Sequence, residues 1–123
     1  MSFCTAVNCM DGRAQDPVAA FLREHYGVRW VDAVTEAGAV RHLVEGTDRV
    51  AGILERCRIS FAAHDSVGLA VAGHADCAGH PVDDERHQAD LLSAARVLAD
   101  RFPGVPVVAL WVDAAGEVHP VSG

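Results

Sequence analysis

The sequence predicts an α/β fold in which a small parallel β-sheet has helices on both faces and an antiparallel strand at one edge. Short apolar and β-branched runs alternate along the chain with segments whose apolar residues recur at spacings of three and four, as in amphipathic helices. Such alternation is typical of a parallel sheet with right-handed crossovers. Near the C-terminus, two apolar runs are separated by Ala114-Ala115-Gly116, which indicates an antiparallel hairpin.

Apolar periodicity and end signals place the individual elements. Helix starts are indicated by capping residues, such as Asp16 before Pro17, and Thr47. Pro103 and Gly104 are typical of a helix end. In chain order, the expected elements are a strand at 3–7, a helix at 17–26, a strand at 29–35, a short helical piece from 36, a helix at 47–63, a strand at 67–72, a helix at 84–101, a strand at 105–112 and an antiparallel strand at 117–121.

Length and composition indicate one globular domain, residues 1–123. A chain of 123 residues, 50% hydrophobic and 22% charged, supports one core and argues against disorder. The apolar runs are too short to span a bilayer, and no basic segment leads into an apolar one at the N-terminus. We therefore expect a cytoplasmic protein without a membrane partner. The formal net charge of −7 lacks the basic footprint of nucleic-acid binding.

Reactive side chains follow two of the expected strands. Cys9, Asp11 and Arg13 come directly after the first strand, and His74 and Cys77 come after the third. In parallel α/β sheets, binding sites form outside the carboxyl ends of the strands. If these two strands are neighbours, as a doubly wound order permits, both thiols and the imidazole converge at one point.

These side chains favour zinc chemistry. Cysteines in a chain without export signals are expected to stay reduced, so they are available as thiols or metal ligands. Two cysteines and one histidine form a known zinc ligand set that leaves a fourth position for water or substrate. The metal lowers the pKa of bound water enough to supply hydroxide near neutral pH. Asp11 can either ligate the metal itself or pair with Arg13 and accept a hydrogen bond from the bound water.

Two segments, Cys9-Met10-Asp11-Gly12-Arg13 and His74-Ala75-Asp76-Cys77, resemble the signature of the β-class carbonic anhydrases, Cys-x-Asp-x-Arg followed by His-x-x-Cys. The order of the two motifs and their position after strands also agree with that family. The resemblance extends to Thr35-Glu36-Ala37-Gly38 and to Leu110-Trp111-Val112-Asp113, and thus covers most of the chain.

The resemblance implies a β-carbonic anhydrase-like zinc domain. Zn2+ would be bound by Cys9, His74 and Cys77, with Asp11 as the alternative fourth ligand. Asp11 and Arg13 would form the catalytic gating pair. The implied reaction is the reversible hydration of carbon dioxide to bicarbonate by zinc-bound hydroxide. A homodimer is also expected, from the apolar strand at 105–112 and the small helical cover.

The chain departs from the family pattern in length and in one motif position. It shows no N-terminal helical arm and has little between the third and fourth strands, parts that help to form the dimer and cover the pocket in the family. Gly12 stands where a serine is common. Two alternatives therefore remain open. One is a non-catalytic zinc-binding or regulatory domain closed by Asp11, and the other is a hydrolase of a carbon dioxide analogue such as carbonyl sulfide or carbon disulfide.

The remaining histidines and cysteines receive simpler interpretations. His80 and His87 are expected to be solvated histidines around a helix start, with extra ligands or proton carriers as the alternative. Cys57 falls on the apolar face of its helix and is expected to behave as a small buried hydrophobic residue. Cys4 is expected to be a buried strand residue.

Overall fold

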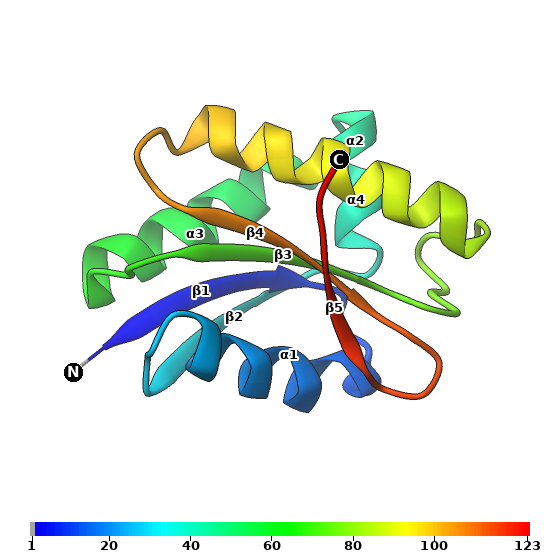
Figure 1. Cartoon of the computed structure of the whole chain (residues 1–123). Coiled ribbons are helices and arrows are strands. Elements are labelled where there is room, and N and C mark those ends of the chain that lie inside the picture. The colour runs from blue at the N-terminus through cyan, green and yellow to red at the C-terminus, as the bar shows by residue number, and fades with distance from the viewer. Residues whose placement is uncertain (1) are drawn as a thin grey trace.

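The computed structural model describes residues 2–123 and folds them as one sheet with helices on both of its faces (Figure 1). Each strand but the last is followed by helical structure or a turn, in the alternation that the sequence predicts. In chain order, the elements are β1 (Phe3–Asn8), α1 (Gly12–His25), β2 (Trp30–Thr35), α2 (Ala39–Glu45), α3 (Val50–His64), β3 (Leu69–His74), α4 (Asp84–Arg101), β4 (Val107–Val112) and β5 (Val118–Val121).

The sheet has the strand order β2-β1-β3-β4-β5. The first four strands are parallel, and β5 runs antiparallel to β4 at one edge. Thr5 pairs with Leu69 and Val7 with Val71, so β1 and β3 are direct neighbours. Their carboxyl ends therefore lie side by side, which is the arrangement that the two sequence motifs require in order to meet.

Two apolar layers hold the helices on the sheet. All six residues of β3 are buried, as expected for a strand covered on both faces. Leu69 and Val71 pack in the cluster that includes residues of α2, α3 and α4. Ala70 and Ala72 face the other way and pack in the cluster that includes residues of α1. Figure 1 shows the same division, with α1 below the sheet and α3 and α4 above it.

Helix α1 begins at Gly12, which corrects the expected start at residue 17. Asp11 is the N-cap, and its Oδ1 accepts a hydrogen bond of 2.9 Å from the backbone N–H of Arg13. The Gln15 side chain adds hydrogen bonds to backbone oxygens at both sides of this turn. Pro17 consequently lies inside the helix, where it lacks the N–H needed for a regular helical bond. The real cap precedes the proline by six residues, so a helix start inferred from Pro17 was wrong.

Several other boundaries differ from the sequence prediction by one to three residues, among them the end of β3 and the start of α3. Strand β3 runs on through His74, so this histidine is the last residue of the strand rather than part of the loop. Helix α3 begins at Val50 instead of residue 47. Thr47 lies in the turn before this start, where its hydroxyl accepts a hydrogen bond of 3.3 Å from the backbone N–H of Arg49 and lies 2.7 Å from Nδ1 of His42. Among residues 2–123, every helix is too short or too polar to cross a bilayer.

Candidate metal centre

Cys9, His74 and Cys77 meet where β1 and β3 end. Cys9 directly follows β1, His74 ends β3, and Cys77 lies in the loop that leads to α4. Their sulfur and nitrogen donor atoms all lie within 4.8 Å of one another. The two sulfurs are 3.9 Å apart. Within the described part of the chain, no other group of three His, Cys, Asp or Glu side chains is arranged in this way.

The orientation of His74 leaves one ring nitrogen free to bind a ligand. Its Nδ1 lies 2.9 Å from the carbonyl oxygen of Ala75. Because a carbonyl oxygen only accepts hydrogen bonds, Nδ1 carries the proton and Nε2 carries the lone pair. Nε2 is buried and has no hydrogen-bond partner among residues 2–123. An unpaired buried nitrogen is costly, so this atom is best explained by a ligand that accepts its lone pair.

The donor set fits zinc. Cys9 and Cys77 are buried, with 7% and 5% of their surface exposed, and neither forms a disulfide. Thiolate sulfur and imidazole nitrogen are the ligands that Zn2+ prefers in proteins. Three protein ligands leave one coordination position open, which is the arrangement of catalytic rather than structural zinc sites.

The other two cysteines lie away from this cluster. Cys4 is fully buried within β1, and Cys57 is fully buried within α3. Burial raises the pKa of each thiol to about 11. Both therefore remain neutral thiols in the core, as their positions in the sequence predict.

Asp11 and Arg13 form an ion pair beside the cluster. The Nε atom of Arg13 donates to Oδ1 of Asp11 at 3.0 Å, and Nη2 donates to Oδ2 at 2.7 Å. This two-pronged geometry is the strong form of an arginine–carboxylate interaction. Hydrogen bonds from the Arg13 side chain and backbone hold the pKa of the Asp11 carboxyl well below its usual range. Asp11 is thus turned toward Arg13 and stands outside the group of three donor atoms.

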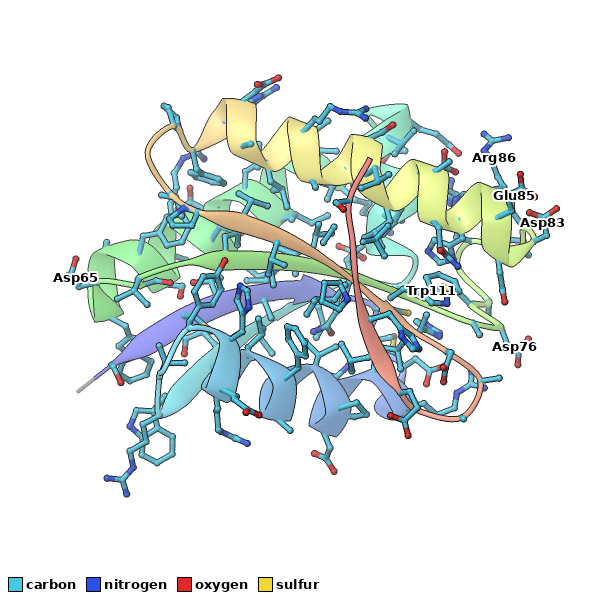
Figure 2. The ribbon with its side chains drawn as sticks, in the orientation of Figure 1. Asp65, Asp76, Asp83, Glu85, Arg86 and Trp111 are labelled. Carbon is cyan, nitrogen blue, oxygen red and sulfur yellow. The ribbon has the colours of Figure 1, made fainter. Side chains whose placement is uncertain are left out.

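Asp76 is a site residue that the sequence analysis missed. Nη1 of Arg13 donates to the Asp76 carboxylate at 3.3 Å, and Nη2 donates to its carbonyl oxygen at 3.1 Å. Asp76 has a φ of +57°, in the left-handed region that aspartate tolerates better than most residues. Figure 2 shows Asp76 on the loop that follows β3. Arg13 therefore links the segment after β1 to the loop after β3. The position of Asp76 between His74 and Cys77 in the second motif is the sequence signal that could have indicated this contact.

Cavities flank the centre on two sides. One has a volume of about 460 Å³ and includes His74 and Arg13 in its lining, together with the β4–β5 turn. The other has a volume of about 410 Å³ and is mainly apolar. The second cavity is lined by Cys9, Met10, Asp11, Gly12, Ala37, Ala78 and Gly79.

The two histidines after Cys77 are buried, which corrects the expectation that they are solvated. His80 is 5% exposed and His87 is 3% exposed. The Nε2 atom of His80 lies 2.7 Å from Oδ2 of Asp90, so it is engaged away from the donor cluster. Burial lowers the pKa of His87 to about 4, which keeps this ring neutral near neutral pH. The loop that carries His80 packs against α4, and the polar sequence around His80 does not reveal this tertiary contact.

The fold and the donor cluster together define the class of protein. It is a mainly parallel α/β domain with a Cys-His-Cys site of the metal-binding type, placed where two adjacent strands end. A family model described as "Putative carbonic anhydrase" matches residues 1–122. The chain therefore belongs to this carbonic anhydrase family, which confirms the resemblance inferred from the two motifs.

A solved structure supports the fold. The chain is similar to the β-carbonic anhydrase CafA of the fungal pathogen Aspergillus fumigatus, with a TM-score of 0.54 and 15% sequence identity. The match covers 98% of this chain and 76% of that one. At this level of identity the likeness concerns the fold, which is β-carbonic anhydrase-like as predicted. No curated protein matches the chain in sequence.

Proposed function

We propose that the protein is a zinc-dependent enzyme of the carbonic anhydrase type that catalyses the reversible hydration of carbon dioxide to bicarbonate. The observation that carries the proposal is the convergence of three buried donor atoms within 4.8 Å, one of them an imidazole nitrogen with no partner in the described chain. Membership of the carbonic anhydrase family supports it. Cys9 and Cys77 would bind the metal as thiolates, and His74 would bind through Nε2.

The role of zinc in such a site is to lower the pKa of water and so provide a nucleophile near neutral pH. The chain's own contribution begins with Arg13, which fixes the Asp11 carboxylate through two hydrogen bonds. An ionised carboxylate only accepts hydrogen bonds. A water or hydroxyl beside Asp11 therefore directs its hydrogen toward the carboxylate and its oxygen lone pair away from it, toward an approaching carbon atom.

The apolar cavity beside Cys9 and Asp11 suits a small uncharged substrate. Gly12, Ala37 and Ala78 contribute little bulk and no polar side-chain group to its lining. Carbon dioxide can enter such a space without losing strong hydrogen bonds to water. The same lining admits carbonyl sulfide and carbon disulfide, so the assay includes these analogues.

Metal content and hydration rate test the proposal. We expect one zinc per chain and, with zinc-loaded protein in a stopped-flow pH-indicator assay, a hydration rate clearly above that of buffer. Protein stripped of metal with a chelator is the matched control, and readdition of zinc should restore the rate. A zinc-loaded protein that hydrates carbon dioxide at the buffer rate would refute this function. Activity on carbonyl sulfide alone would show that carbonyl sulfide, and not carbon dioxide, is the substrate.

Three further expectations from the sequence belong with this proposal. Residues 1–123 act as a single domain, the chain forms a homodimer, and it works in the cytoplasm. Proteolytic resistance of the whole chain, light scattering and cell fractionation test them in that order. A monomeric mass in light scattering would contradict the homodimer while leaving the zinc chemistry in place.

A further inference from the structure

A buried hydrogen bond between His80 and Asp90 attaches the loop that carries Cys77 to helix α4. His80 and Asp90 are 5% and 8% exposed, and their Nε2 and Oδ2 atoms are 2.7 Å apart. Arg86, one turn before Asp90 on the same helix, donates from Nε to both carboxylate oxygens at 3.2 and 3.1 Å. Figure 2 shows Arg86 near the start of α4. The carboxylate thus joins the loop to the helix through His80 and is itself held in place by Arg86.

The loop is also held from the opposite side by the turn between β2 and α2. The backbones of Gly79 and Gly38 approach so closely that a Cβ atom on either residue would overlap the backbone of the other. Arg41 donates from Nε to the carbonyl oxygen of Gly79 at 3.0 Å. The residue before His80 is therefore fixed by α2 while His80 itself is fixed by α4.

His87 of α4 connects His80 to the end of β3. The ring of His87 meets the His80 ring and the Trp111 ring edge-to-face, with centroid distances of 4.8 and 5.0 Å. A Cβ atom at Gly73 would lie 2.9 Å from Nε2 of His87. The histidine ring is thus packed directly against the backbone that precedes His74.

The connection from this support to the donor atoms is short. The backbone N–H of His80 donates to the carbonyl oxygen of Cys77 at 3.2 Å, which closes a tight turn between them. A fixed His80 therefore fixes the position of Cys77. We propose that His80 and Asp90 are positioning residues that hold the Cys77 thiol in the geometry that the metal requires.

The inference rests on the proposed function, because it assumes that the three donors bind zinc. Partners that orient metal ligands without touching the metal commonly change metal affinity by about 10–100-fold when they are removed. His80→Ala removes the link to α4 and is expected to weaken zinc binding by about that factor. His80→Gln places a donor nitrogen near the position of Nε2 and should recover most of the affinity.

The molecule offers a matched control. His119 and Asp113 form a second pair with the same Nε2–Oδ2 distance of 2.7 Å, but His119 is exposed and lies on β5. His119→Ala should leave zinc affinity at the wild-type value. Arg86→Ala, at an exposed side chain, loosens Asp90 without opening the core, and is expected to weaken zinc binding less than His80→Ala does, because the bond between His80 and Asp90 remains.

Zinc affinity is measured by competition with a chromogenic chelator, and the visible spectrum of the Co2+-substituted protein reports ligand geometry. We expect a changed cobalt spectrum in His80→Ala and a wild-type spectrum in His80→Gln and His119→Ala. Wild-type affinity and spectrum in folded His80→Ala would overturn the inference. If His80→Ala does not fold, wild-type affinity in Arg86→Ala together with unchanged hydrogen exchange over residues 77–80 would overturn it.

The two proposals fail in different ways. A wild-type protein that binds no zinc refutes the proposed function itself. A wild-type protein that binds zinc, with His80→Ala indistinguishable from it, leaves the proposed function standing and removes only the positioning role of His80 and Asp90.

Discussion

Cys9 and Cys77 bring the same donor atom to the same cluster from segments of different construction. Cys9 lies between the end of β1 and the start of α1, separated from the helix cap Asp11 only by Met10. It is fixed by neighbours in the chain, including the Gln15 side chain, which donates to its carbonyl oxygen at 2.8 Å. Cys77 lies in a longer loop, residues 75–83, which is fixed by α4, by α2 and by the turn that precedes α2.

The difference separates two tasks within one centre. The segment after β1 is held locally and carries the Asp11–Arg13 pair, the part of the centre that would meet substrate. The end of β3 and the segment after it are held by contacts from distant parts of the chain and contribute two of the three donors. Apart from the donors themselves, substitutions in the first segment should therefore affect turnover, and substitutions around the second should affect metal binding and stability.

The largest expected effect is the loss of a donor from either segment. Cys9→Ser and Cys77→Ser should each abolish most zinc binding and lower hydration to the buffer rate, because two remaining protein ligands are too few for a catalytic zinc site. Elemental analysis and the stopped-flow assay measure both. Cys57→Ala, which removes a buried thiol outside the cluster, should keep its zinc. Wild-type zinc content in either serine variant would show that the donor is wrongly assigned.

Substitution of Asp11 should separate turnover from metal binding. Asp11→Asn keeps a side chain that caps helices as well as aspartate does, but it loses the acceptor-only carboxylate. We expect zinc content and stability to remain while kcat falls by about 10²- to 10⁴-fold, the usual range for a proton-handling group. Asp11→Ala should show the same kinetic loss and, in addition, about 1 kcal/mol of destabilisation from the missing cap. Unchanged kcat in both variants would show that Asp11 and Arg13 do not act as a gating pair.

The buried His87 predicts a stability change with pH. Its pKa is lowered from 6.5 to about 4 by burial, so the unfolded chain binds this proton more readily than the folded one. Stability from this group is therefore full above pH 6.5 and is lost as pH falls toward 4, by about 3 kcal/mol in total. Urea unfolding of metal-free protein at pH 7 and pH 4.5 measures it. His87→Gln should show a smaller loss between these pH values, and an equal loss would exclude His87 as its source.

The close approach of Gly38 and Gly79 predicts a second stability effect. Gly38→Ala places a Cβ atom into the backbone of Gly79 and should cost about 1–3 kcal/mol through overpacking, in addition to the cost of a positive φ. Gly46→Ala is the control, because Gly46 has a similar φ of +68° and open space around it. Thermal unfolding of the two variants gives the difference. Equal melting temperatures would show that the loop shifts without cost.

The sequence was sufficient for the elements whose signals are local. The apolar alternation predicted every strand and the α/β class, and α4 begins and ends where its periodicity and Pro103 indicate. The two motifs pointed to Cys9, His74 and Cys77 because parallel strands end at the same edge of a sheet, so adjacency of β1 and β3 was enough to bring them together.

The remaining features depend on distant contacts or on local geometry that residue types do not specify. The partner of His80 is Asp90 on the next helix, so the apparently polar segment gave no sign of its burial. Asp76 contacts Arg13 from a backbone with a positive φ, which its residue type permits but does not specify. The start of α1 was missed because Pro17 gives a strong local signal that the Asp11 cap overrides.

The capping hydrogen bond at the start of α1 also makes the state of the centre observable from the backbone. The N–H of Arg13 donates to Oδ1 of Asp11, the same oxygen that receives the Nε hydrogen bond of the Arg13 side chain. If the carboxylate swings toward a bound metal, this amide loses its partner at the same moment. The chemical shift and exchange rate of one backbone resonance in 15N-labelled protein would then distinguish the resting form from the active one, without a substrate or a crystal.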